Sequence, residues 1–247
     1  MNQTCKNCGN HFKGHFCNNC GQKAAVERFS FAHITGEIVY AFTHADKGFF
    51  TLLKKMLIHP GLVSYEYIVE FKRKKYFNLF TFFVLITAVS AFIENKDLLL
   101  KEEMFRTNNI YGMKLIFYNK LLSAIIIPVV AFGIWVIHLP KRKLMYSEYT
   151  VFAMLLMSLK AILDIGANLF DYAGTFFSHR NIDISESAGY AIVLLLVISS
   201  ASFGFHRKLK NDSWWQSLLS GILFIIIQYL AQLLIVVVVI NKLKGIG

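Results

Sequence analysis

Residues 77 to 93 read FNLFTFFVLITAVSAFI, a stretch without a single charge that follows the basic run FKRKKY and ends before Glu94. A helix that crosses the roughly 30 Å hydrocarbon core of a bilayer needs about 20 mainly apolar residues, so this stretch predicts a transmembrane helix. The composition agrees, because 55% of the 247 residues are hydrophobic and only 17% are charged. We therefore expect an all-α integral membrane protein.

Four more stretches are long and apolar enough to span a membrane. They cover residues 115 to 139, 148 to 170, 188 to 205 and 214 to 240. Pro128 is expected to bend the first of these, which neighbouring helices can accommodate. The sequence thus predicts about five transmembrane helices, with four or six as alternatives.

The basic residues predict which side of the membrane each loop faces. Lys and Arg outnumber acidic residues by 26 to 15, for a formal net charge of +11. KRK at 141 to 143 follows the second predicted span, and HRKLK at 206 to 210 follows the fourth, on the same side as the basic N-terminal region. The positive-inside rule then places the N-terminus in the cytosol and the C-terminus outside.

The N-terminal segment CKNCGNHFKGHFCNNCGQK, residues 5 to 23, contains the only four cysteines of the chain. Two Cys-x-x-Cys-Gly turns offer four thiolates to one tetrahedral ion, so Cys5, Cys8, Cys17 and Cys20 predict a structural Zn²⁺ site with no open position for catalysis. The alternatives are a pair of disulfides or redox use, and another metal. A cytosolic position, where thiols stay reduced, favours zinc.

A segment of about 50 residues separates this zinc ribbon from the first span. GFFTLLKKMLI, residues 48 to 58, forms an apolar face after Asp46, a candidate N-cap. Apolar residues also recur at helical spacing earlier, at Phe31, Ile34, Ile38 and Phe42. We expect amphipathic helices here, lying on the cytosolic membrane surface or packed against the bundle. The predicted organisation is a zinc ribbon (1–24), juxtamembrane helices (25–76) and a transmembrane bundle (77–247).

The first 90 residues resemble an uncharacterised bacterial family of zinc-ribbon membrane proteins, catalogued as domain of unknown function three-six-six-seven. The four cysteines match the ribbon of that family. The linker motif is matched by Asp46, Gly48, Thr51, Pro60, Gly61, Arg73 and Tyr76. This chain has Phe71 where the family tends to have Gly, and Leu79 where Pro is expected. The resemblance implies a multi-pass protein of the bacterial inner membrane and supplies no activity.

The third predicted span carries polar residues on one face. Lys160, Asp164 and Asn168 are spaced by four residues, so they project from the same side of a helix. Gln228 and Gln232 form a similar pair on the fifth span. The functional interpretation is an intramembrane polar site, and the structural one is an ion pair with amide contacts that fixes packing. Because one Lys–Asp pair neutralises itself and no second strongly charged span is evident, the structural interpretation is favoured.

The sequence favours a non-enzymatic function. It contains no phosphate-binding glycine loop, HExxH pair or GxSxG turn. His138 and His206 fall at predicted helix ends, where a solvated or headgroup-facing position is expected.

Three functions are compared. The first is a membrane protein whose ribbon docks a cytosolic protein, and the second is a transporter or channel for a small solute or ion along the polar face of the third span. The third, nucleic-acid binding by basic residues around the metal site, has the weakest support because the ribbon contains no basic run. The bilayer is the one partner that composition predicts, and the oligomeric state is left open.

Overall fold

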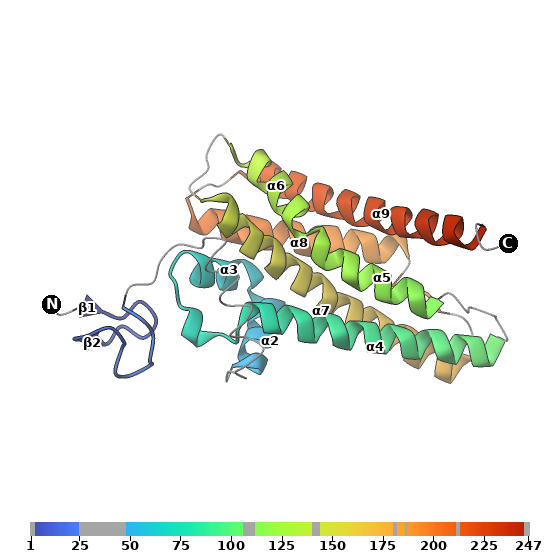
Figure 1. Ribbon diagram of the computed structural model, residues 1–247, viewed down its shortest axis with the longest axis horizontal. Helices are drawn as coiled ribbons and strands as arrows, with labels where there is room; N and C mark the ends of the chain where they lie inside the picture. The colour runs from blue at the N-terminus through green and yellow to red at the C-terminus, as the bar shows by residue number, and fades with distance from the viewer. Residues whose placement is uncertain are drawn as a thin grey trace.

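The computed structural model describes residues 3–24, 48–105, 112–139, 144–179, 182–185, 187–210 and 213–244. A small ribbon precedes a bundle of long helices (Figure 1). The ribbon contains two antiparallel strands, β1 (Gln3–Thr4) and β2 (His11–Phe12). The helices are α2 (Phe49–Ile58), α3 (Pro60–Ile68), the 3-10 turn η1 (Arg73–Lys75), α4 (Leu79–Phe105), α5 (Gly112–Ile125), α6 (Ile127–Ile137), α7 (Tyr146–Ser178), α8 (Ala188–Lys208) and α9 (Trp214–Lys244).

Helices α4, α7, α8 and α9 contain stretches long and apolar enough to cross a membrane. Helices α5 and α6 pass the same test together and meet at a bend of 41°. The bend lies at Ile126, two residues before Pro128, which confirms the bend predicted from the sequence. The described residues thus provide four candidate spans, or five if the bent pair is one span.

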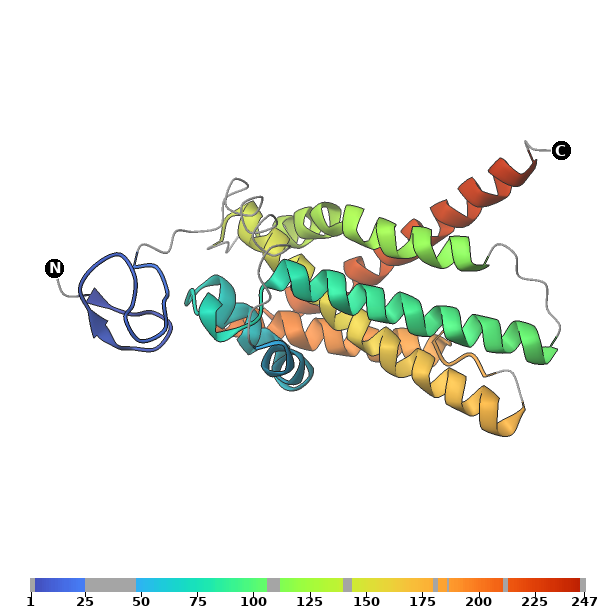
Figure 2. The ribbon, with the colours of Figure 1, turned by 60° about the horizontal axis from the view of Figure 1, so that its bottom comes forward.

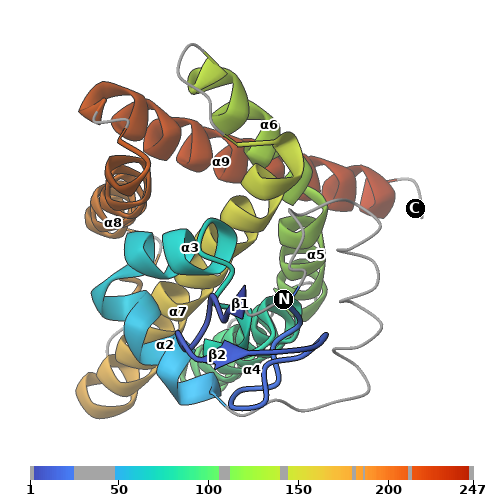
Figure 3. The same cartoon turned by 90° about the vertical axis from the view of Figure 1, so that its left-hand side faces the viewer.

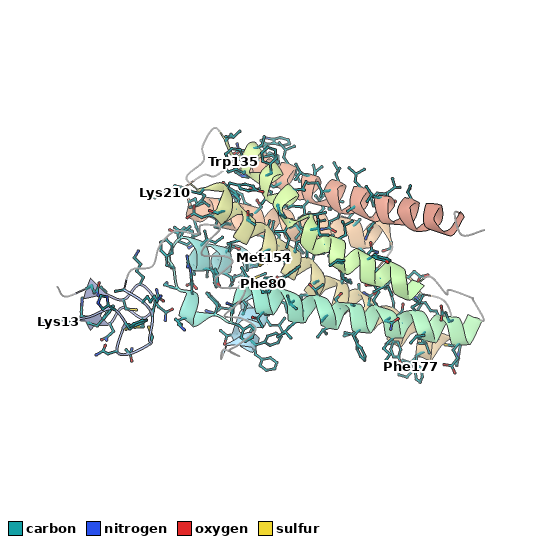
Figure 4. The ribbon with its side chains drawn as sticks, in the orientation of Figure 1. Lys13, Phe80, Trp135, Met154, Phe177 and Lys210 are labelled. Carbon is teal, nitrogen blue, oxygen red and sulfur yellow. The ribbon has the colours of Figure 1, made fainter. Side chains whose placement is uncertain are left out.

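The long helices run side by side, with the ribbon beyond one end of the bundle (Figures 1 and 2). Lys210 lies at that end, hereafter the ribbon end, and Phe177 lies at the opposite end, hereafter the far end (Figure 4). The side chains that face outward along α8 and α9 are largely apolar, among them Leu196, Ile226 and Leu230. This surface is what a helix bundle presents to lipid.

Helix α7 is the central element of the bundle. It packs against α4, α6, α3 and α8, and Phe152, Leu155 and Leu159 on it are almost fully buried. At its N-terminus Glu148 accepts a hydrogen bond from the Met145 backbone N–H at 2.7 Å, which satisfies a donor that the helix leaves free. Because α7 is packed among these helices, polar groups on its buried faces lie inside the protein.

The two short helices before α4 cross the ribbon end of the bundle (Figure 3). Val63, Tyr67 and Ile68 of α3 are buried in the main hydrophobic core, and α3 packs mainly against α8. Of the two positions expected from the sequence, on the membrane surface or packed against the bundle, α3 thus has the second. Helix α2 begins after Gly48, and the predicted helix through Phe31 to Phe42 and the Asp46 cap lie outside the described residues.

Candidate metal centre and buried polar networks

The ribbon consists of two copies of one local structure. In the first, the Cys5 N–H donates to Asn10 O and the Gly9 N–H to Cys5 O; in the second, Cys17 and Gly21 make the equivalent bonds. Gly9 and Gly21 have φ of 74° and 72°, in the left-handed region that favours glycine. The Cys-x-x-Cys-Gly sequence thus folds twice into the same tight turn.

These two turns bring all four thiols together. The Sγ atoms of Cys5, Cys8, Cys17 and Cys20 lie within 4.8 Å of one another. Cys5 and Cys20 are 3.5 Å apart, and Cys8 and Cys17 are 3.6 Å apart. A tetrahedral ion with metal–sulfur bonds near 2.3 Å would separate its sulfurs by about 3.8 Å, so the cluster fits one such ion.

The turns also favour the ionised form of one of the four thiols, that of Cys17. Burial opposes ionisation of Cys17, but the backbone N–H groups of Cys20 and Asn19 outweigh it and lower the Cys17 pKa to about 6. Burial raises the pKa of Cys5 to about 11. Because four adjacent thiolates repel one another, a bound cation is what would hold them all deprotonated.

The ribbon contacts the rest of the protein at Phe71, in the loop between α3 and η1. The buried Gln22 side chain donates from Nε2 to Phe71 O at 2.9 Å, and the Lys6 ammonium lies 4.6 Å from the centre of the Phe71 ring. Phe71 has φ of 56°, a conformation that glycine adopts without cost. The side chain that makes this contact is therefore held on a strained backbone.

Glu66 fixes the Phe71 loop against α3. Its buried carboxylate accepts hydrogen bonds from Lys75 Nζ at 2.6 Å and from the Tyr76 hydroxyl, and Lys72 Nζ lies 3.6 Å away. Burial alone would raise the Glu66 pKa, but the bonds from Lys75 and Tyr76 lower it below its usual value. The loop that touches the ribbon is thus tied to α3 by an ionised carboxylate.

Helix α3 is fitted closely to α8 at two glycines. A Cβ on Gly61 would lie 2.6 Å from Phe205 N and 2.7 Å from Gly204 C. Gly204 of α8 therefore lies in close contact with the juxtamembrane helix α3. The chain of contacts runs from the ribbon through Phe71, Glu66 and α3 to α8.

The predicted polar face of the third span belongs to a larger network within the bundle. Lys160 Nζ pairs with Asp164 Oδ2 at 2.6 Å, and the Tyr190 hydroxyl of α8 donates to Asp164 Oδ1. Lys120 of α5 lies 3.7 Å from Asp164 Oδ2 and 2.8 Å from Glu94 Oε2 of α4. Two lysines and two carboxylates from three helices therefore neutralise one another.

This network differs from the sequence expectation that no second charged span was available. Lys120, Glu94 and Tyr190 were not identified as site residues, although Lys120 interrupts the second apolar stretch and Glu94 closes the first. Lys120 also donates to Ser90 Oγ at 3.0 Å, so its position is fixed by three partners on two helices.

The other predicted polar residues lie in different positions. Asn168 is buried one turn beyond Asp164 on α7. Gln228 is buried and donates from Nε2 to Met157 Sδ at 2.9 Å, whereas Gln232 is exposed on the outer face of α9. The structure thus brings Lys160 and Asp164 together and gives neither glutamine a recorded contact with them.

A second charged cluster lies toward the far end. Lys101 of α4 pairs with Asp97 Oδ2 at 2.7 Å and with Asp183 in the α7–α8 loop. The fully buried Asp171 accepts the backbone N–H groups of Ile184 at 2.8 Å and Ser185 at 3.1 Å. These contacts hold the loop between α7 and α8 against α4 and α7.

A third polar group is buried near the ribbon end, where His138 and His206 lie side by side. Their exposed fractions are 0% and 1%, so the solvated position expected from the sequence is wrong for both. Each Nδ1 lies near a carbonyl one turn earlier in its own helix, Ile134 O at 2.9 Å and Ser202 O at 2.8 Å. Close packing of α6, α7 and α8 removes these rings from water.

Comparison with known proteins adds no relative. No protein-family model, curated protein sequence or solved structure matches the chain significantly.

Proposed function

We propose that the protein is a multi-pass protein of the bacterial inner membrane that uses an N-terminal zinc ribbon as a cytosolic docking or regulatory module. Zn²⁺ is the proposed ion because four thiolates in a closed tetrahedral set are the donors of structural zinc sites. The charge distribution of the sequence supports the cytosolic position of the ribbon. The bacterial inner membrane is part of the proposal because residues 1 to 90 carry the motif residues expected of the zinc-ribbon membrane family, although no family model matches the chain.

The contact of Gln22 with Phe71 carries this proposal. A metal-folded head joined to the membrane part by a flexible tether alone would need no buried contact with it. Here Gln22 bonds to a loop that Glu66 ties to α3, and α3 packs on α8 through Gly61. A partner that binds the ribbon can therefore act on the bundle through a continuous set of contacts.

Hydrogen exchange on the full chain in membranes tests the coupling. Removal of the metal with a chelator should increase exchange in residues 69 to 76 as well as in the ribbon, and Gln22→Ala should increase it in 69 to 76 while the metal stays bound. The α7–α8 loop at 182 to 185 is the internal control and should not change. If residues 69 to 76 keep their protection without metal, the ribbon is not coupled to the bundle.

Crosslinking and capture from intact membranes tests the docking role. The native chain should retain a cytosolic protein that the double variant Cys5→Ser, Cys8→Ser loses. His15→Ala, which changes an exposed ribbon residue outside the thiol cluster, is the matched control. Identical captured proteins from all three chains would contradict a docking role for the metal-folded ribbon.

The four-residue charge network supports a second candidate, a transporter or channel for an ion or small solute. Charged groups inside a membrane protein are costly and often mark a substrate pathway. Vesicles containing the protein should then show flux of protons or alkali cations that Lys160→Ala and Asp164→Ala abolish. The packing interpretation stands if the native protein gives no flux above empty vesicles and both variants lose stability.

A further inference from the structure

Two lysine side chains, of which only Lys75 pairs with a carboxylate among the described residues, approach the same tyrosine ring on the ribbon side of the protein. The ammonium groups of Lys55 and Lys75 lie 5.4 Å and 5.5 Å from the centre of the Tyr76 ring. The Lys75 ammonium is also among the groups that lower the pKa of Lys55. Like charges near one another repel, and an anion shared by the two ammonium groups would relieve that repulsion.

Among the described residues, the acidic side chains nearby already have partners. Glu66 pairs with Lys75 and Lys72, and Glu70 pairs with Lys72 at 2.6 Å. No ion pair to a carboxylate is recorded for Lys55 within the described residues. Burial and the neighbouring Lys75 lower the Lys55 pKa, and the attraction of Glu66 offsets only part of this effect.

The surroundings of Lys55 and Lys75 are basic as a whole. Within the described residues this region contains two acidic side chains, Glu66 and Glu70, and six basic ones: Lys54, Lys55, Lys72, Arg73, Lys74 and Lys75. All six belong to α2 or to the run that leads into the first span, so they lie on the ribbon side of α4. Such juxtamembrane clusters attract anionic lipid headgroups.

An apolar surface adjoins these cations on α2. Phe50, Leu57 and Ile58 are 78%, 53% and 56% exposed, although Leu52 and Met56 on the same helix are buried in the core. Phe49 packs 5.7 Å from the Phe77 ring, so α2 lies beside the residue at which the first apolar stretch begins. The exposed apolar side chains therefore belong to a helix that adjoins the start of the first candidate span.

We propose that Lys55 and Lys75 bind the phosphate of an anionic phospholipid headgroup, with the acyl chains of that lipid lying against Phe50, Leu57 and Ile58. The pairing of two cations with an adjacent apolar face selects an amphiphile over a free phosphate ion. Because Lys75 also bonds to Glu66, the bound lipid contacts the loop that carries Phe71. The site thus lies next to the ribbon contact, and it depends on the membrane location proposed above.

Lipid titration of the full chain, purified in an uncharged detergent with its metal bound, tests the site. The probes are short-chain phosphatidylglycerol, short-chain phosphatidylcholine with the same acyl chains, and inorganic phosphate. The native protein should bind phosphatidylglycerol more tightly than phosphatidylcholine. Lys55→Gln should weaken phosphatidylglycerol binding about fivefold, the effect expected for one lysine at an anionic surface.

Two further variants make the result specific. Lys208→Gln, which removes an exposed lysine at the end of α8, should bind phosphatidylglycerol as the native chain does. Leu57→Ser should weaken phosphatidylglycerol binding without affecting inorganic phosphate. Helical circular dichroism and zinc content confirm that each variant is folded.

Three outcomes would overturn the assignment. They are equal binding of the two lipids, unchanged binding of phosphatidylglycerol by Lys55→Gln, and a soluble-anion site in which inorganic phosphate competes fully and Leu57→Ser has no effect. A failure of the membrane proposal itself would look different, because no variant would then insert into vesicles at all.

Discussion

The imidazole rings of His138 and His206 stack with their centres 3.7 Å apart and their planes 6° apart. Each Nδ1 lies near a backbone carbonyl, and because a carbonyl only accepts, each Nδ1 carries the ring proton. In neutral rings, both Nε2 atoms are then acceptors without a proton. The Tyr149 hydroxyl lies 3.5 Å from His206 Nε2, whereas His138 Nε2 has no partner among the described residues.

His138→Phe should leave stability unchanged or raise it by up to about 1 kcal/mol. The substitution keeps an aromatic ring against His206. It also removes His138 Nε2, a buried acceptor without a donor, and such an unpaired acceptor destabilises the native protein. Unfolding of the purified protein in mixed micelles, by heat or denaturant, measures the change. A loss above about 2 kcal/mol would mean that His138 Nε2 has an unseen donor or ion.

Gly61→Ala should destabilise the protein by about 2 kcal/mol or more. The added methyl group would lie 2.6 to 2.8 Å from backbone atoms of Ala201, Gly204 and Phe205, so α3 must move away from α8. Gly166→Ala is the control, because a Cβ there meets no atom within 4 Å and alanine favours the helix by up to about 1 kcal/mol. Equal unfolding midpoints for both variants would contradict the close α3–α8 contact.

The Lys120–Glu94 pair can be tested with a double-mutant cycle. Lys120→Met leaves Glu94 without the cation 2.8 Å away and should cost about 3 to 5 kcal/mol, whereas Lys120→Met with Glu94→Gln should recover at least about 1 kcal/mol. The measurement is again unfolding in mixed micelles. Strictly additive losses would show that the two residues do not interact.

Local chemistry explains what the sequence could predict. The spacing of Cys5 and Cys8, repeated at Cys17 and Cys20, specifies a turn within a few residues, and that turn forms as expected. The apolar stretches specify helices for the same reason, and Pro128 specifies its bend. None of these features depends on which helices become neighbours.

The networks depend on neighbours, so one sequence alone does not show them. Lys120 and Glu94 join Asp164 because α4, α5 and α7 happen to pack together, and His138 meets His206 because α6 and α8 end side by side. The useful sequence signal was Lys120, a single charge in an otherwise apolar stretch, because such a residue needs a partner on another helix.

Removing the metal should unfold the ribbon and leave the bundle intact. The ribbon core contains little more than Cys5, Phe12 and Cys17, too small to fold alone, so metal binding would supply its folding free energy, on the order of 10 kcal/mol. Chelation or Cys17→Ser should therefore expose residues 3 to 24 to trypsin, with helical circular dichroism nearly unchanged. The intact chain should contain one zinc ion by elemental analysis.

The same experiment separates the four-thiol site from its alternatives. His15 is exposed and lies outside the thiol cluster, so His15→Ala should retain a full equivalent of zinc, whereas Cys17→Ser should lose it. Thiol labelling after removal of the metal should modify four cysteines, because a pair of disulfides would leave none reactive. Loss of metal from His15→Ala would indicate that a histidine is one of the ligands. Thiols that react only after reduction would indicate a disulfide-linked ribbon.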